Sequence, residues 1–303
     1  MKCSCGLEPI YFRRYSGQYF CKSCFNTYFE TKVYETINKH NLIEPGEKVA
    51  VGVSGGKDST VLLHILNKLS KQLKIELYPI TIDEGITGYK ENGLSAVRKN
   101  CEALGLPLEI VSLEENTGFR LDKLASKGDK KPCTYCGVFR RKFLNQWSLE
   151  IGADKLATGH NLDDEAQAVM MNYISGDIDR LQRLNGKIQN HYLVRRVKPL
   201  SKLPEKEIMI YALLNKLEIS QDECPYAREN HRTKVRDFLN ELEVERPGVK
   251  FSIINGQNRL QNTQSGGRAK VQRCEVCEHA TTRNKCRACE LTEEIKIKMS
   301  GEI

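Results

Sequence analysis

The chain has 303 residues, about twice the usual size of one domain, so we expect one large domain with appendages or two domains. With 40% hydrophobic and 28% charged residues, its composition is that of a globular protein and excludes disordered and collagen-like chains. The net charge of +8 suits a polyanionic partner, although such an excess also occurs without one. Neither a membrane-length apolar run nor the apolar stretch of a secretory signal is present, so we expect a cytoplasmic protein with no membrane association.

The first 30 residues contain two close pairs of cysteines, which predict an N-terminal zinc module over residues 1–30. The pairs read C-x-C and C-x2-C, and they comprise Cys3, Cys5, Cys21 and Cys24. Twelve cysteines in a reducing cytosol favour metal binding or catalysis over disulfides, and four thiolates suit one tetrahedral zinc ion. The first pair is one residue shorter than the usual spacing, which leaves open whether Cys3 and Cys5 bind the same ion. The alternative is a set of unliganded thiols.

Residues 31–254 alternate short apolar runs with helical patterns, which predicts a catalytic domain of the α/β class with a doubly wound parallel sheet. Ligands bind such sheets at the carboxyl ends of the strands. Cys101 lies in an amphipathic helical stretch and is expected in the core. The expected strands are residues 48–53, 77–82, 108–112 and 155–158, and the expected helices include residues 89–104 and 138–151.

A glycine-containing loop, Ser54–Ser59, follows the first strand and precedes a helix whose apolar residues recur at helical spacing. Gly55 and Gly56 allow the backbone to approach an anion, the amides at the helix start donate to phosphate oxygens, and Lys57 adds a positive charge. The loop is not a Walker A motif, because the glycine required at position 51 is a valine. The loop therefore predicts a phosphate site of another kind.

Cys133, Cys136 and Cys224 form a third group of cysteines. Three thiolates make an incomplete zinc cage, whereas an iron–sulfur cluster held by three thiolates keeps one iron open. A C-x2-C pair also suits a redox dithiol. Spacing alone leaves the cluster, the dithiol and a structural metal equally possible.

The C-terminal part of the chain repeats the zinc pattern. Residues 255–272 are rich in Gly, Asn, Gln and Ser, and they predict a linker before a C-terminal zinc module and tail at residues 273–303. The module reads C-x2-C, eight residues, C-x2-C, a spacing that predicts a second zinc ion. Its ligands would be Cys274, Cys277, Cys286 and Cys289.

The phosphate loop resembles the pyrophosphate loop (PP-loop) of the N-type ATP pyrophosphatases, which cleave ATP between the α and β phosphates. The motifs PCTYCG at 132–137, ATGHNLDDEA at 157–166 and ECPY at 223–226 extend the similarity to tRNA 2-thiolation enzymes. The chain is most similar to the archaeal and eukaryotic cytosolic thiouridylase group and its thermophile 2-thiouridine synthetase relatives. The resemblance covers nearly the whole chain, because that group also has a zinc module at each end.

The resemblance implies a PP-loop fold of the adenine nucleotide alpha hydrolase type and an ATP-dependent tRNA thiolation. ATP would adenylate the 2-oxygen of a uridine, releasing pyrophosphate, and sulfur would then displace AMP. The implied cofactors are ATP, Mg²⁺, a 4Fe–4S cluster and two Zn²⁺. The implied partners are tRNA, a second copy of the chain in a homodimer, and a sulfur donor, either free sulfide or a ubiquitin-like thiocarboxylate protein.

The same resemblance assigns roles at the nucleotide site. Lys57 would neutralise developing charge, and Asp58 would meet phosphate only through Mg²⁺, because two anions repel. Arg140 would reach the α-phosphate, and Asp164 would hold Mg²⁺ or position the uridine, unless it only complements the helix dipole. The pyrophosphate would be held by Ser54, Gly55, Gly56, Asp58 and Ser59, and the adenine and ribose framed by Val53, Ile82 and Gly159.

By the same resemblance, Cys133, Cys136 and Cys224 would hold the cluster. An alternative scheme places a persulfide on Cys133 or Cys136 and uses another cysteine to resolve it. Basic clusters and the aromatic residues of the first zinc loop are candidate RNA contacts. They are Arg13–Arg14, Lys130–Lys131, Arg140–Lys142, Arg195–Arg196, Arg268–Lys270, Tyr11, Phe12, Tyr15 and Tyr19.

We expect the wobble uridine as the target, because an abundance of thermolabile Asn, Gln and Cys argues against a hyperthermophilic source, and T-loop thiolation is associated with thermophiles. T-loop uridine thiolation stays an alternative. Anticodon-loop cytidine thiolation, amide formation such as lysidine synthesis, and a nonenzymatic zinc-ribbon RNA-binding protein are the other hypotheses.

Overall fold

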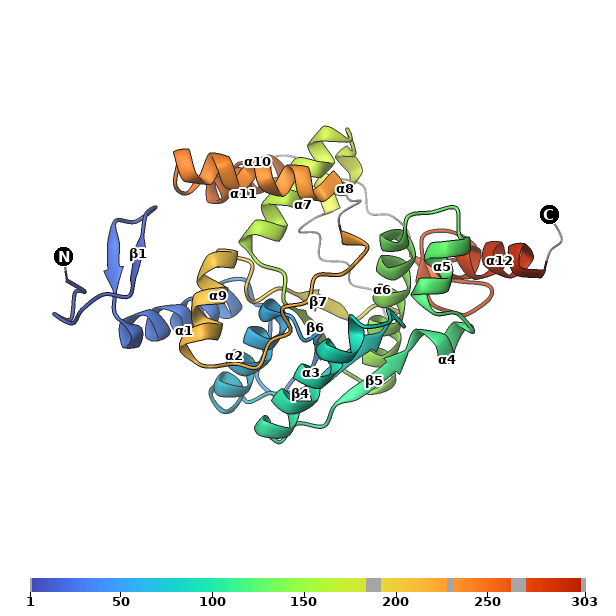
Figure 1. Ribbon diagram of the computed structural model, residues 1–303, viewed down its shortest axis with the longest axis horizontal. Coiled ribbons are helices and arrows are strands. Elements are labelled where there is room, and N and C mark those ends of the chain that lie inside the picture. The colour runs from blue at the N-terminus through green and yellow to red at the C-terminus, as the bar shows by residue number, and fades with distance from the viewer. Residues whose placement is uncertain (1, 184–191, 228–230, 263–270, 301–303) are drawn as a thin grey trace.

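The computed structural model describes residues 2–183, 192–227, 231–262 and 271–300. Its centre is a five-stranded sheet in the order β5-β4-β3-β6-β7, and every neighbouring pair is parallel (Figure 1). The predicted α/β class with a parallel sheet is therefore confirmed. The strands are β3 (Lys48–Gly52), β4 (Glu76–Asp83), β5 (Glu109–Ser112), β6 (Lys155–Thr158) and β7 (Arg195–Val197).

Both faces of this sheet are covered by helices, as parallel strands require. Val49 and Val51 contact a core formed with α1, α2, α3 and α9, whereas Ala50 points to the opposite core with α6, and all three are fully buried. The alternation follows from the period of two residues along a strand. The covering helices are α1 (Lys22–Lys39), α2 (Lys57–Leu73), α3 (Lys90–Leu104) and α9 (Glu205–Leu214) on the first face, and α6 (Pro132–Glu150) on the second.

All four predicted strands are present, and the predicted helix 89–104 is α3. Helix α6 begins six residues before the predicted residue 138, because Pro132 stands in its first turn, where a proline loses no hydrogen bond. Cys101 is buried in the core as expected. The fifth strand, β7, is not predicted by the sequence pattern, since it has three residues and two of them are arginines.

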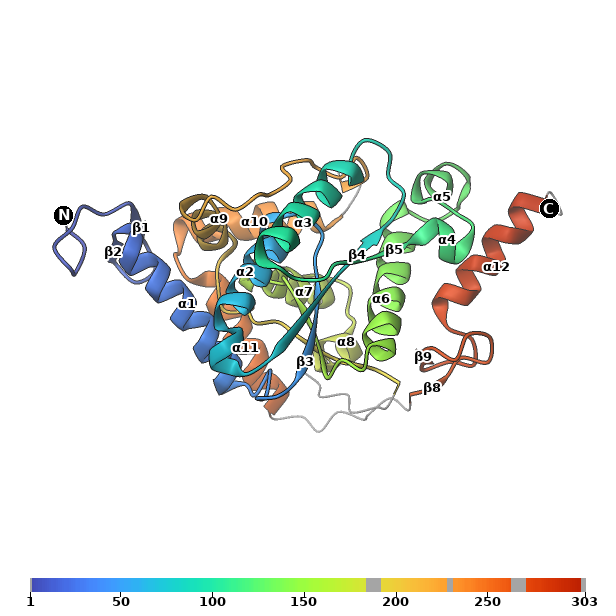
Figure 2. The ribbon, with the colours of Figure 1, turned by 90° about the horizontal axis from the view of Figure 1, so that it is seen from below.

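The two cysteine-rich modules lie at opposite ends of the molecule, with the parallel sheet between them (Figures 1 and 2). Each contains a two-stranded antiparallel sheet followed by a helix. The N-terminal module contains β1 (Tyr11–Arg13) and β2 (Gln18–Phe20) before α1, and the C-terminal module contains β8 (Gln272–Arg273), β9 (Ala280–Thr281) and α12 (Arg287–Ser300).

A further group of helices packs beside the carboxyl edge of the sheet around Leu162, Val169, Leu239 and Ile254. The prediction of a linker at 255–272 is wrong for residues 255–262, which continue helix α11, while residues 263–270 lie outside the described ranges. Ile254 anchors this helix in the core, so the polar residues after it extend an existing helix. The group contains α7 (Leu162–Ile174), α8 (Ile178–Arg183), α10 (His231–Glu245) and α11 (Val249–Asn262).

Two short helices, α4 (Leu113–Thr117) and α5 (Leu121–Lys127), connect β5 to α6. Within the described residues, none of the helices combines the length and the apolar character needed to cross a membrane.

A buried ion pair between Lys250 of α11 and Asp163 of α7 generates a stability prediction. Both side chains are less than 10% exposed, and Lys250 Nζ also donates to Asn240 Oδ1 at 2.6 Å. Replacing Lys250 with methionine leaves Asp163 buried without its counter-charge, so we expect a loss of about 3 to 5 kcal/mol in the free energy of unfolding. Urea denaturation measures it. The double variant K250M with Asp163→Asn should recover most of the loss, and a K250M variant as stable as the parent would contradict the prediction.

Candidate functional site

The phosphate loop lies between the end of β3 and the first turn of α2. Gly56 caps α2 without any side-chain hydrogen bond, so the amides of the first turn are not satisfied by a cap. Ser59 stabilises the loop from inside, because its Oγ accepts from Ser54 N at 3.0 Å and donates to Gly56 O at 3.1 Å. The loop is thus arranged to present amide groups to an anion.

Three backbone segments meet at this loop, and two glycines are required by their closeness. Gly55 has φ of +85°, and a Cβ there would lie 2.4 Å from the carbonyl oxygen of Gly93 in α3. A Cβ at Gly159, in the turn after β6, would lie 2.9 Å from Asp58 C. No side chain fits at either position. Backbone packing therefore requires glycine at both positions, independently of any contact with a nucleotide.

A cavity of about 400 Å³ opens beside the loop at the carboxyl edge of the sheet. This is the position at which doubly wound sheets bind ligands. The structure places most of the predicted nucleotide residues in its lining, while Gly55 and Lys57 lie next to it without lining it. The predicted residues in the lining are Val53, Ser54, Gly56, Asp58, Ser59, Ile82, Arg140, Gly159 and Asp164.

Lys57 is engaged by two carboxylates in this structure. Its Nζ lies 3.0 Å from Asp58 Oδ2 and 2.6 Å from Glu205 Oε1. Burial lowers the pKa of Lys57, but Asp58 and Glu205 outweigh burial and raise it overall. Lys57 is therefore a firmly protonated cation that must exchange a carboxylate for phosphate if it is to contact a nucleotide.

Asp58 lines the cavity between a cation and an amide donor. Its Oδ1 accepts from Asn161 Nδ2 at 3.0 Å, opposite the contact with Lys57. Burial raises the pKa of Asp58 despite these partners. A buried carboxylate with a raised pKa binds a divalent cation favourably, because the cation compensates its charge.

Asp164 both caps a helix and lines the cavity, so its position suits either predicted role, and its role toward Mg²⁺ or the uridine stays a prediction. Its carboxylate accepts from Asn161 N at 3.1 Å, and Asn161 Oδ1 accepts from Asp164 N at 3.0 Å, which forms a capping box at the start of α7. Arg232 of α10 also lies 2.5 Å from Asp164 Oδ1. Both carboxylate oxygens thus have protein partners.

Several cavity residues escape the sequence analysis of the nucleotide site: Glu84, Lys90, His160 and Arg232. Glu84 and Lys90 form an ion pair of 2.8 Å, and both side chains are less than 10% exposed. Burial, Lys198 and Arg196 lower the pKa of His160 to about 3, so this imidazole is neutral at pH 7. The histidine stands in the quoted motif ATGHNLDDEA, which is the one signal that could have identified it.

The three central cysteines come from two segments beside this cavity. Cys133 and Cys136 lie in the first two turns of α6, and Cys133 Sγ contacts the carbonyl oxygen of Tyr226, two residues after Cys224, at 3.7 Å. Burial raises the pKa of Cys136 to about 11; Arg140 opposes this shift, while Cys224 and Cys133 add to it. The three thiols are therefore neighbours, and Arg140 connects them to the cavity.

The spacing of these thiols differs from that of the terminal sets. Among the described residues, two groups of cysteines place all their sulfurs within 4.8 Å of one another, and Cys133, Cys136 and Cys224 are not among them. A cluster binds each thiolate on a different iron, so its ligand sulfurs lie further apart than those around a single ion. The donor set fits a cluster better than a mononuclear ion.

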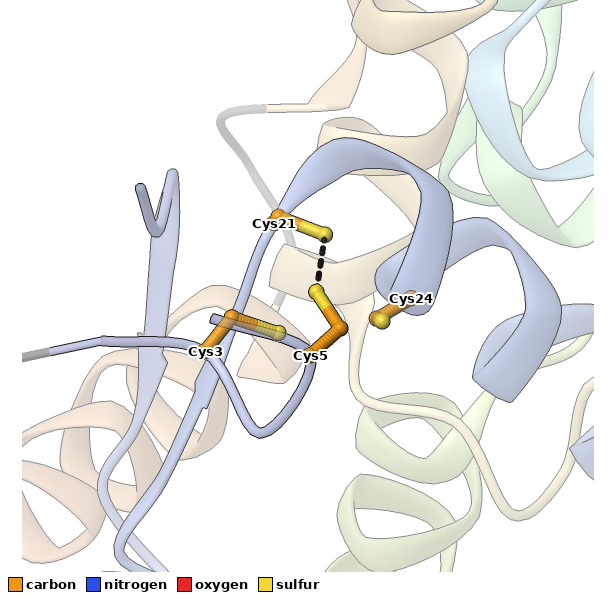
Figure 3. Close-up of side chains that lie close together, drawn as sticks. All are labelled: Cys3, Cys5, Cys21 and Cys24. Atoms are coloured by element: carbon orange, nitrogen blue, oxygen red, sulfur yellow. Dashed lines mark hydrogen bonds between the residues drawn. The ribbon is translucent and has the colours of Figure 1, made fainter. Parts of the chain in front are cut away.

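The two terminal sets have the geometry of four-thiolate metal sites. Cys5 Sγ and Cys21 Sγ lie 3.5 Å apart (Figure 3), and Cys277 Sγ and Cys286 Sγ lie 3.6 Å apart. A tetrahedral zinc ion with four thiolates separates its sulfurs by about 3.8 Å. All four N-terminal sulfurs converge, so Cys3 and Cys5 are placed to bind the same ion.

One predicted RNA contact is wrong. Arg13 is 4% exposed, and its guanidinium lies over the rings of Phe20 and Tyr28 at 4.5 and 3.9 Å from their centroids. The aromatic residues of the first module enclose this charge and compensate it by cation–π contacts, so it is not available to a phosphate.

Tyr11 and Tyr15, two other candidates, donate hydrogen bonds to Glu207 of α9 and attach the module to the sheet domain. Phe12 is exposed and stacks on Tyr19 with centroids 4.4 Å apart, which leaves a ring face for a base. The candidate cluster Arg268–Lys270 lies outside the described residues.

Comparison with known proteins identifies relatives over almost the whole chain. Residues 25–243 match the family model described as a PP-loop domain. Cytoplasmic tRNA 2-thiolation protein 1 of Laccaria bicolor is 39% identical, with 94% of this chain and 82% of that protein covered. A probable sulfurtransferase of Methanocaldococcus jannaschii is 36% identical, with 98% and 88% covered.

A solved structure that is similar in both sequence and fold comes from an archaeon. It is described as the U34-tRNA thiolase NcsA from Methanococcus maripaludis with its [4Fe-4S] cluster. Its TM-score is 0.87 at 39% identity, and the alignment covers 97% of this chain and 96% of that one.

The close approach at Gly55 generates a prediction for the phosphate loop. Gly55→Ala should lose nucleotide binding and lower the free energy of unfolding by about 2 to 5 kcal/mol, because the methyl group meets the Gly93 carbonyl and the left-handed backbone is strained. Gly105→Ala is the control. It has φ of +64° with nothing within 4 Å of its Cβ, so it should cost only about 1 to 2 kcal/mol. If the G55A and G105A variants lost the same free energy of unfolding in urea denaturation, the structure would have relieved the clash at Gly55 and the prediction would be wrong.

Proposed function

Because the chain belongs to the PP-loop family and is related throughout its length to cytoplasmic tRNA 2-thiolation protein 1, we propose that it is an ATP-dependent tRNA thiolase. It replaces the 2-oxygen of a uridine with sulfur, and the uridine that we propose as its target is the wobble uridine. The observation that carries the proposal is that helix α6, whose first two turns hold Cys133 and Cys136, places Arg140 in the lining of the cavity beside the phosphate loop.

In this proposal the first half of the reaction is activation of the base. The uridine 2-oxygen attacks the α-phosphorus of ATP, a bond to the bridging oxygen breaks, and pyrophosphate leaves. The loop amides and Lys57 bind the pyrophosphate, and Arg140 neutralises charge at the α-phosphate. Asp58 would hold a Mg²⁺ ion, which would supply positive charge for the phosphates. Val53, Ser54, Gly56, Ser59, Ile82 and Gly159 frame the nucleotide.

The second half is substitution at carbon 2. A sulfur nucleophile forms a bond to that carbon, and the carbon–oxygen bond breaks, so AMP leaves with the former uridine oxygen. Cys133, Cys136 and Cys224 hold a 4Fe–4S cluster, which supplies an iron with an open position for exogenous sulfur. Cys136 lies one helical turn before Arg140, so the sulfur chemistry would take place next to the residue that contacts the α-phosphate.

The terminal cysteine sets each hold one zinc ion in this proposal, and both ions are structural because every thiol is occupied. Residues 1–30 and 273–303 are the zinc modules, and the catalytic domain begins at residue 31. Since α11 extends to Asn262, we place the end of that domain there. We further propose a cytoplasmic location, a homodimer, and sulfide or a thiocarboxylate protein as the sulfur donor.

Thiolation by the isolated protein tests this function. Anaerobically purified protein with ATP, Mg²⁺, sulfide and unmodified tRNA should form 2-thiouridine at the wobble position, as measured by nucleoside mass spectrometry with fragment mapping. A thiolated T-loop uridine or a thiolated cytidine would replace the wobble assignment. Release of AMP without any thiolation would favour amide formation.

The cysteine variants sharpen that test. Cys136→Ala should lower thiolation by about 100-fold or more and remove the cluster absorbance, because a ligand of the cluster is lost. Thr134→Ala changes an exposed neighbour in the same turn and should retain both. Full thiolation by the C136A variant would contradict the role of Cys136.

Metal analysis tests the zinc sites separately from activity. Atomic emission should find two zinc ions per chain, and Cys24→Ser or Cys289→Ser should each remove one, because three thiolates and a hydroxyl hold zinc less tightly. Cys101→Ala is the control, since Cys101 lies in the core outside both sets and should retain two ions. A count of two in the C24S variant would contradict the prediction for Cys24.

A further inference from the structure

The cations that line the cavity differ in whether a carboxylate accompanies them. Lys90 is paired with Glu84, and Arg232 is paired with Asp164. Arg140, Arg141 and Arg196 form no ion pair within 4.0 Å in the described part of the chain. The lining therefore carries three arginines that no carboxylate of the described residues pairs at ion-pair distance.

Two of these three arginines face each other and repel. Arg196 lies opposite Leu156 in the register of β6 and β7, and Leu156 belongs to the core on the α6 side of the sheet. Its guanidinium thus faces helix α6, which carries Arg141. Burial lowers the pKa of Arg196, and Arg141 and Arg140 lower it further. Burial and Arg140 likewise lower the pKa of Arg141.

Arg140 is in a different electrostatic position. Burial lowers its pKa, but Cys136 and Glu84 outweigh burial and raise it overall. Cys136 and Glu84 therefore compensate Arg140. For Arg141, burial, Arg140 and Arg180 outweigh the contribution of Cys136, and for Arg196 no anionic neighbour opposes the lowering of its pKa. The walls of the cavity partly desolvate both side chains, but each keeps surface that solvent, and therefore a ligand, can reach.

The position of the pair separates it from the phosphate loop. Arg196 comes from β7, which is two strands from β3 in the sheet order, and neighbouring strands lie about 4.8 Å apart. The loop of β3 already supplies the amides and the lysine for one polyphosphate. An unpaired arginine pair on the far side of the same cavity fits a second anion.

From these observations we infer that Arg141 and Arg196 bind a backbone phosphodiester of the RNA substrate, next to the nucleotide that enters the cavity. The inference rests on the proposed function, in which tRNA is the second substrate. The negative charge of that substrate lies on its backbone phosphodiesters. Two guanidiniums can each donate two hydrogen bonds to a phosphate. Such a contact positions the nucleotide without reading its base.

Binding measurements test the pair. The double variant Arg141→Met with Arg196→Met should bind an unmodified tRNA transcript about tenfold more weakly in fluorescence anisotropy at 0.15 M KCl. The slope of log Kd against log salt should fall by about 0.7 to 0.9 for each arginine removed, because fewer counterions are released. The Kd for ATP with Mg²⁺, measured by calorimetry, should stay within about twofold of the parent value.

A charge-matched control separates local contact from net charge. Arg98→Met with Lys99→Met removes two exposed cations from α3, outside the cavity lining, and should leave both affinities and the salt slope nearly unchanged. Thermal melts should show the R141M/R196M variant to be at least as stable as the parent, since its arginines repel each other.

Results other than those expected above overturn the inference. A weaker Kd for ATP with unchanged tRNA binding would assign the pair to the nucleotide's own phosphates. Unchanged affinity for both would mean that the pair binds neither anion. If the parent protein itself fails to bind the transcript, the proposed function fails with the inference, whereas parent binding with unaffected variants overturns the inference alone.

Discussion

The arrangement of the site depends on the close approach of three backbone segments beside the phosphate loop. Gly55 touches the backbone of Gly93 in α3, and Gly159 touches the backbone of Asp58 and Ser59. Because no side chain separates these segments, the loop amides, the start of α3 and the turn before α7 have fixed relative positions. The cavity is the space that remains between this junction and helix α6, so its shape follows from backbone packing more than from any single lining side chain.

Helix α6 connects the cavity to the central cysteines and to the C-terminal cysteine module. Its first turn begins at Pro132 and holds Cys133, while Arg140 lies one turn after Cys136 and lines the cavity. The same helix contributes Phe139 and Phe143 to the core that also contains Leu291 of α12 and the buried cysteines of the C-terminal module. The C-terminal module lies at one end of the molecule (Figure 2), yet its residues share a core with the helix that carries two of the central cysteines. A metal ion in that module would therefore stabilise the position of the cysteine helix.

The sequence predicts local features of this protein well and long-range features poorly. Buried parallel strands read as short apolar runs, and the phosphate loop is contained in six consecutive residues, so both are found without a structure. From the sequence, Arg196 is only one of many basic candidates, because its strand is too short and too polar to show a pattern. Arg13 illustrates the opposite error, since two adjacent arginines suggest a surface patch while three-dimensional packing encloses one of them in aromatic rings. Pairings such as Glu84 with Lys90, or Asp164 with Arg232, depend on a fold that brings separate segments together.

Ion pairs divide the cavity into a neutralised part and a charged part, and the two parts suit different ligands. On the side of the loop, Lys57 is held by Asp58 and Glu205, so an entering polyphosphate competes with carboxylates and needs the loop amides and an accompanying cation to bind. This requirement favours a nucleotide that arrives with its metal ion over a bare anion. On the side of β7, Arg141 and Arg196 have no carboxylate to displace, so an anion of single charge is sufficient to relieve their repulsion. The distribution of carboxylates, more than the number of cations, thus decides which phosphate binds at which wall.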